Sequence, residues 1–261
     1  MSGMFHPSVH AANAPDRLAV VTPSTGETRT YAELEARSNQ IASLLRARGL
    51  QRGDVVAVVM TNDVAWYEVI WGVQRCGLYV VPVNWHLAAK ETAYIVADCE
   101  AKALIASADL ADTIAALGEV ADDVPLRLSV GGALPGFESL EEATVGLPET
   151  ASADDIEGSW MFYSSGTTGQ PKGIKPGLPT IEFGDMNPLV GLISGLYGLQ
   201  PESVYLSPAP LYHAAPAGWS TTVHRIGGTV VVMDRFDPLE WMRLVEEHKV
   251  THTQMVPTYL V

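Results

Sequence analysis

The pattern of hydrophobic and polar positions along the chain predicts helices that alternate with short apolar strands. Apolar residues recur at helical spacing from Tyr31 to Arg48, which predicts a first amphipathic helix. Thr30 and Glu33 stand at the spacing of a capping box, so this helix is expected to begin at that point. The continuous apolar run from Val55 to Met60 then predicts a buried strand.

The same alternation continues up to about residue 130. Asn62 or Asp63 can cap a second helix, which is expected to run to about Arg75. Further strands are predicted at 79–83, 103–106 and 126–130, and further helices near 89–97 and 110–117. Short apolar strands between helices are typical of a parallel sheet that is covered on both faces. This part of the chain is therefore predicted to be α/β.

A change of composition follows. From Gly131 to Glu157 glycine, proline and acids dominate without periodicity, which predicts a surface connection whose acids Asp154, Asp155 and Glu157 are solvated. Later helices are predicted at 187–197, 218–226 and from Asp237 onward, and later strands at 160–163, 204–206, 229–233 and 253–256. Because the last segment is still apolar at Val261, we expect the chain to stop within a fold.

Composition and charge narrow the class of protein. The chain has 261 residues, of which 47% are hydrophobic, enough for a sizeable core. Its 30 acids against 16 bases give a formal charge of -14, which disfavours nucleic acid as a partner. Cys76 and Cys99 lack the spacing of a disulfide framework or zinc site, which favours a reducing cytoplasm. No apolar run approaches the length of a transmembrane segment.

A loop rich in Gly, Ser and Thr follows the strand predicted at 160–163. Glycines let backbone N–H groups approach an anion, hydroxyls add donors, and lysine supplies a positive charge. Between Gly158 and Ile181 there are two lysines and no acid, although the chain is acidic overall. The loop is therefore predicted to bind phosphate. Its candidate binding residues are Ser164, Ser165, Gly166, Thr167, Thr168, Gly169, Lys172 and Gly173.

Other serine- and glycine-rich motifs fit this loop less well. A Walker A loop needs GxxxxGK followed by Ser or Thr, whereas Lys172 stands three residues after Gly169 and precedes another glycine. A nucleophile elbow would need glycine in place of Tyr163, and the SxxK pattern is absent from the loop. An amidase-type Ser-Ser-Gly site stays an alternative for Ser164 and Ser165, but it does not extend to Thr-Thr-Gly-x-Pro-Lys-Gly.

The segment from Tyr163 to Gly173 resembles the signature loop of the adenylate-forming superfamily. That superfamily includes acyl- and aryl-CoA synthetases, luciferases and peptide-synthetase adenylation domains. Weaker landmarks at 30–34, 53–57 and 81–84 occur in the expected order, and Pro208 to His213 is similar to the second core motif. The resemblance therefore covers nearly the whole chain.

Two segments bear on the subclass. After the loop, 173–177 reads Gly-Ile-Lys-Pro-Gly, where many members of the superfamily have a Ser/Thr-His pair. The segment 212–216 resembles ligases for fatty or related carboxylic acids more than amino-acid adenylation domains. By this resemblance His213 borders the nucleotide and the acyl group; taken alone, it would be an ordinary loop histidine. His224 and Trp219 are read as core residues, with an acyl-pocket role for Trp219 left open.

The resemblance implies a fold of two doubly wound, mostly parallel sheets covered by helices, as in the large N-terminal domain of such enzymes. A first α/β subdomain is expected at about 55–180, ending in the phosphate loop. A second, incomplete subdomain is expected from about 15–50 together with 185–261. The small C-terminal domain is expected to be absent from 1–261.

The resemblance also implies a reaction. A carboxylate attacks the α-phosphate of ATP to give acyl-AMP and pyrophosphate, and coenzyme A then forms the thioester, with Mg2+ neutralising phosphate oxygens. Lys172 and the loop donors would stabilise the leaving group, and His213 would border the reacting centre. The small-molecule partner is then a carboxylic acid, and self-association into a homo-oligomer stays open.

Several elements of the superfamily do not occur in 1–261: the Tyr-Gly-x-Thr-Glu motif for adenine and metal, the ribose-binding aspartate, and the catalytic lysine of the C-terminal domain. We therefore expect these residues alone not to complete the reaction. A non-catalytic chain that binds nucleotide or a partner polypeptide stays the alternative function.

Overall fold

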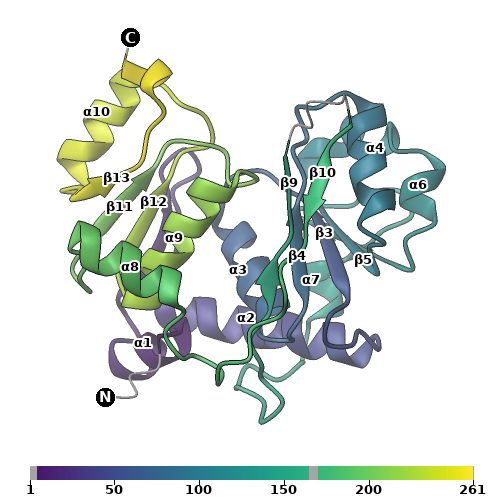
Figure 1. Ribbon diagram of the computed structural model, residues 1–261, viewed down its shortest axis with the longest axis horizontal. Coiled ribbons are helices and arrows are strands. Elements are labelled where there is room, and N and C mark those ends of the chain that lie inside the picture. Colours follow the sequence, from purple (N-terminus) through teal and green to yellow (C-terminus); the bar gives the residue numbers. More distant parts are fainter. Residues whose placement is uncertain (1–4, 165–169, 261) are drawn as a thin grey trace. The chain divides into compact units, whose positions relative to one another are not determined.

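A computed structural model describes residues 5–164 and 170–260, and the chain divides into two compact units (Figure 1). One unit comprises 1–36, 62–67 and 184–261, and is called the split unit here because its segments are far apart in sequence. The other comprises 37–61 and 68–183, and is called the central unit. The prediction of an α/β protein with parallel sheets covered by helices is confirmed.

The central unit is built on a six-stranded sheet in the order β7-β6-β5-β3-β4-β8, with all neighbours parallel. Every residue of β3 and β5 is buried, which matches the expectation of strands covered on both faces. The strands are β3 (Val55–Val59), β4 (Tyr79–Pro82), β5 (Ala103–Ser107), β6 (Leu126–Val130), β7 (Glu138–Ser139) and β8 (Ser159–Trp160), and a separate antiparallel pair is β9 (Phe162–Ser164) with β10 (Lys172–Ile174).

Helices cover both faces of this sheet. On one face Ile95 and Ile114 pack against side chains of β3 and β5 in one apolar cluster. Elsewhere Ile41 and Gly72 approach so closely that a Cβ at residue 72 would lie 2.6 Å from an Ile41 methyl carbon. The helices are α2 (Tyr31–Ala47), α3 (Val64–Gln74), α4 (Ala89–Asp98), η1 (Ala108–Leu110), α5 (Ala111–Ala115), α6 (Glu119–Asp122) and α7 (Leu140–Ala143), of which α2 and α3 also contribute residues to the split unit.

The split unit holds a five-stranded sheet in the order β13-β11-β12-β1-β2, parallel except for the β1–β2 pair. Val231, Leu206 and Val21 form one buried row and pack against Leu244 of α10. On the opposite face the Tyr205 ring stacks on Trp219 of α9. The elements are α1 (Pro7–Asn13), β1 (Leu18–Thr22), β2 (Glu27–Thr30), α8 (Pro188–Tyr197), β11 (Val204–Ser207), α9 (Ala214–Ile226), β12 (Thr229–Val232), α10 (Pro238–Glu247), β13 (His252–Thr253) and η2 (Pro257–Leu260).

The expected helix caps are present. Glu33 Oε2 accepts the Thr30 N–H at 2.7 Å, and the Glu33 N–H donates to Thr30 Oγ1 at 3.2 Å, so the capping box is confirmed. Asp63 Oδ1 accepts the Trp66 N–H at 3.0 Å and caps α3. Asp237 Oδ1 likewise accepts the Glu240 N–H at the start of α10. Local sequence therefore determines where these helices begin.

The segment 131–157 is more ordered than predicted. It contains β7, which extends the sheet, and α7, where Leu140 and the C-cap residue Thr144 are buried. The prediction that these acids are solvated is wrong for Asp155 and Glu157. The Asp155 side chain is only 4% exposed, and Glu157 is also 4% exposed. Asp155 is buried through hydrogen bonds with Arg46 and Arg75, which lie far away in sequence and leave no local pattern.

Buried His224 gives the protein a pH dependence of stability. Its ring Nε2 lies 3.0 Å from the Ala19 carbonyl oxygen, and burial lowers its pKa to about 3 from an ordinary 6.5. Between these values the unfolded chain binds a proton that the folded chain does not. The free energy of unfolding should therefore fall with decreasing pH below 6.5, by at most about 1.4 kcal/mol per pH unit. Urea unfolding at pH 7 and pH 5 measures this, and His224→Gln should lose that part of the slope; an unchanged slope would contradict the assignment.

No helix among residues 5–164 and 170–260 combines the length and the apolar character needed to cross a membrane.

Candidate functional site

A β-hairpin in the central unit holds the two ends of the predicted phosphate loop. Ser164 ends β9, Lys172 begins β10, and these two residues are direct partners in the antiparallel register. Both are exposed. The hydroxyl and the ammonium group at the base of the loop are therefore presented from the same strand pair. The candidates Ser165, Gly166, Thr167, Thr168 and Gly169 lie outside the described residues. Strand β10 was not predicted.

Gly173 leaves room for a close approach of the Tyr163 side chain, its partner across the hairpin. A Cβ on residue 173 would lie 2.9 Å from Tyr163 Cζ and 2.7 Å from Met161 Cε. Real Cβ atoms do not approach other heavy atoms this closely, so the tyrosine ring occupies the space that a side chain would need.

Gly173→Ala should therefore displace the hairpin and weaken ATP binding about tenfold, at a cost in stability of about 1–3 kcal/mol. Calorimetric titration with ATP and urea unfolding measure the two effects. Gly177→Ala is the matched control, because a Cβ at residue 177 meets no atom within 4 Å. Equal effects of the two substitutions would contradict this account of Gly173.

The second lysine of the loop region is held in place by an aromatic ring. Lys175 Nζ lies 4.7 Å from the centroid of the Tyr79 ring, within the range of a cation–π contact. The Tyr79 hydroxyl in turn donates to the Pro176 carbonyl oxygen at 2.5 Å. These two contacts hold the backbone just after β10, where the chain leaves the hairpin. Lys172 lies at the start of β10, next to the phosphate loop.

His213 lies in the split unit and is the N-cap residue of α9. The residue is exposed, its ring centroid is 4.6 Å from that of Tyr212, and partial burial of the ring lowers the pKa of His213. The helix begins at Ala214, four residues earlier than the 218 predicted from the sequence. Pro216 is tolerated in this first turn because the missing N–H would have no partner within the helix.

Asn62 anchors the segment that leads to His213, a role that the sequence did not indicate. Its amide group donates to the carbonyl oxygens of Ala209 and Met233 at 3.2 and 2.9 Å, and its Oδ1 accepts the Leu211 N–H at 2.9 Å. Asn62 was one of two candidate caps for α3, but Asp63 takes that position instead. Asn62 thus connects the segment that follows β11 with the segment that follows β12.

Two residues of the split unit were predicted to belong to the core, and the structure buries His224 fully and Trp219 partly. The Trp219 ring meets Tyr197 at 4.6 Å and Tyr205 at 6.1 Å. These ring contacts favour the packing role for Trp219.

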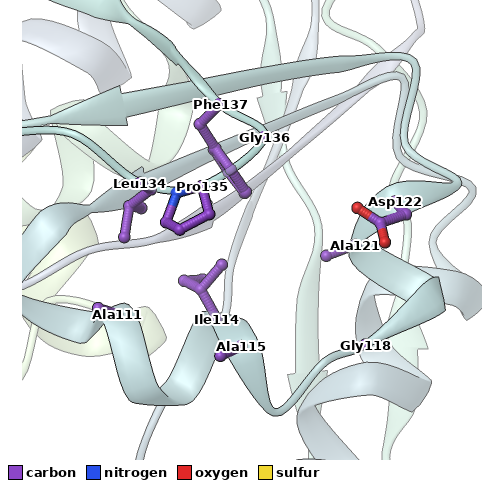
Figure 2. A pocket seen from close by; sticks show the side chains of 10 residues that line it. All are labelled: Ala111, Ile114, Ala115, Gly118, Ala121, Asp122, Leu134, Pro135, Gly136 and Phe137. Carbon is purple, nitrogen blue, oxygen red and sulfur yellow. The ribbon is translucent and has the colours of Figure 1, made fainter.

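A cavity of about 360 Å3 opens elsewhere in the central unit, between α5, α6 and the loop before β7 (Figure 2). Ile114, Leu134 and Phe137 line it together with small residues, and Asp122 lies at its edge. None of the described candidate residues of the phosphate loop contributes to it.

Metal-binding geometry is absent from the described parts of both units. No group of three or more His, Cys, Asp or Glu side chains within 5–164 and 170–260 could hold a metal ion.

Comparison with known proteins agrees with the α/β fold. The family model described as AMP-binding enzyme matches residues 8–261, so the chain belongs to the AMP-binding enzyme family.

Two curated relatives and one solved structure are similar to this chain over most of its length. A long-chain-fatty-acid–CoA ligase of Mycobacterium tuberculosis is 30% identical over 96% of this chain and 48% of its own length. A feruloyl-CoA synthase of an Amycolatopsis species is 33% identical over 89% of this chain and 44% of its own length. The inhibitor-bound N-terminal domain of FACL13 from Mycobacterium tuberculosis superimposes with a TM-score of 0.79 at 26% identity, covering all of this chain and 64% of that one. The chain thus spans about half the length of the curated relatives it matches.

Proposed function

We propose that the protein takes part in the ATP-dependent activation of a carboxylic acid, first as an acyl-AMP and then as a coenzyme A thioester. A fatty acid or a related apolar carboxylic acid is the proposed substrate. Support for this choice comes from the relatives named above, which are a ligase for long-chain fatty acids and a synthase for feruloyl-CoA.

The hairpin is the observation that carries the proposal. Its register pairs Lys172 with Ser164, so these two residues bound a loop whose sequence is rich in small donors. In this arrangement the charge of Lys172 and the loop N–H and O–H groups would hold the β- and γ-phosphates of ATP. Donors of this kind stabilise pyrophosphate as it leaves, because they are already oriented before the reaction.

The residues present fit a triphosphate, but they do not account for magnesium or coenzyme A. Both described ends of the loop are exposed, and Lys172 supplies a charge that complements phosphate. The described residues contain no group of side chains that could hold a metal ion, so no magnesium ligands are assigned. His213 is proposed to border the acyl-AMP, and no residue is assigned to coenzyme A.

ATP binding and pyrophosphate exchange test this function. Residues 1–261 should bind ATP more tightly than AMP in calorimetric titrations, because the loop is proposed to hold the β- and γ-phosphates that AMP lacks. Carboxylate-dependent exchange of labelled pyrophosphate into ATP should stay at background, since the adenine, ribose and lysine elements of the superfamily do not occur in this sequence. Equal affinity for ATP and AMP, or no ATP binding, would overturn the proposal; strong exchange would show that these residues suffice.

A further inference from the structure

The end of helix α4 is hydrogen-bonded to Tyr163, the middle residue of β9 in the phosphate-loop hairpin. Asp98 is the last residue of α4, and its Oδ2 accepts the Tyr163 hydroxyl at 2.6 Å. Its Oδ1 accepts the Tyr94 hydroxyl at 3.0 Å. One carboxylate thus receives two phenols, one from its own helix and one from β9, 65 residues further along the chain.

The same tyrosine reaches the strand that carries Lys172. The Tyr163 ring lies against Gly173, where a Cβ would be 3.1 Å from the phenol oxygen. Gly173 follows Lys172 directly and is the partner of Tyr163 across the hairpin. A continuous path of contacts therefore runs from Asp98 through Tyr163 and Gly173 to Lys172.

The position of Asp98 is unfavourable for an acid. It stands in the last turn of α4, where the helix dipole favours positive charge. Residues that break local rules in this way are expected where function requires them. What the Asp98 carboxylate contributes is the pair of hydrogen bonds that it accepts from Tyr94 and Tyr163.

We propose that Asp98 is a positioning residue for the phosphate loop: through Tyr163 it holds the β9–β10 hairpin, and with it Lys172, in the geometry that receives phosphate. The inference deepens the proposed function and rests on it for the identity of the ligand. The contact itself is a property of the chain without ligand.

Hydrogen–deuterium exchange of residues 162–174 in the ligand-free chain tests the positioning. Tyr163→Phe and Asp98→Ala each remove the hydrogen bond and should speed exchange in the hairpin about fivefold, the factor expected for one net hydrogen bond. Tyr94→Phe is the matched control, because it leaves the Asp98–Tyr163 contact intact and should exchange like the wild type. Wild-type exchange in both Tyr163→Phe and Asp98→Ala would overturn the inference.

Titration with inorganic tripolyphosphate, which has no adenine or ribose, tests the consequence for binding. Each of the two substitutions should raise the dissociation constant about fivefold, and the double variant should be no weaker than either alone. Asp98→Asn, which keeps an acceptor for the phenol, should recover about half of the loss on a logarithmic scale. Losses that arise independently at the two residues would add up, so additive losses would count against the inference. Failure of the wild type to bind tripolyphosphate would remove the proposed function, while the exchange experiment would still decide the positioning.

Discussion

Asp155→Ala is expected to destabilise the protein by about 3–5 kcal/mol, the range for breaking a buried ion pair. Asp155 Oδ1 accepts a hydrogen bond from Arg46 Nη2 at 2.7 Å, and its Oδ2 accepts one from Arg75 Nε at 3.2 Å. The Arg75 side chain is fully buried. Removal of the carboxylate would leave two guanidinium groups near each other, one of them in a site with no access to water.

Urea unfolding followed by tryptophan fluorescence measures this loss. Asp155→Asn should fall between the wild type and the alanine variant, since the amide keeps one acceptor but not the charge. Asp154→Ala removes an exposed acid one residue earlier and should change stability by less than about 0.5 kcal/mol. If the two alanine variants lost equal stability, the buried cluster would not have the role assigned to it.

Asp155 also shows where prediction from the sequence fails. Its partner Arg46 is 109 residues away, so an acid next to other acids in a segment without periodicity looks like a solvated side chain. The helix starts at Thr30, Asp63 and Asp237 were predictable because a cap acts within three residues. Strands of two or three residues, such as β7 and β10, exist only through their pairing partners, which no local pattern identifies.

The candidate site divides in the same way. The loop motif contains Lys172 and Ser164 as sequence letters, but only the register of the hairpin makes them partners. The contacts of Asn62 with Ala209 and of Asp98 with Tyr163 join residues 147 and 65 positions apart. The motif in the sequence therefore predicts which residues contact a ligand. The residues that hold them in place can be identified only from the fold.

Lys172→Ala is expected to weaken ATP binding about 10- to 100-fold, the effect of losing a charged hydrogen-bond donor. Because Lys172 is exposed, the free energy of unfolding should stay within about 0.5 kcal/mol of the wild type. AMP affinity should change little, since the proposed contacts of Lys172 are to the β- and γ-phosphates. Calorimetric titrations with ATP and AMP at two salt concentrations measure these effects, and the salt dependence of ATP binding should fall in the variant.

Two further variants separate the charge of Lys172 from its position. Lys172→Arg keeps the charge but replaces a compact ammonium group by a planar guanidinium, so it should recover part of the ATP affinity. Lys175→Ala removes a lysine of the same loop region whose ammonium group lies over the Tyr79 ring, and it should weaken ATP binding less than threefold. Should Lys175→Ala be as damaging as Lys172→Ala, general positive charge and not the geometry of the hairpin would account for binding. A selective loss at Lys172 would instead mean that the acidic chain binds its anion through one lysine fixed across from Ser164.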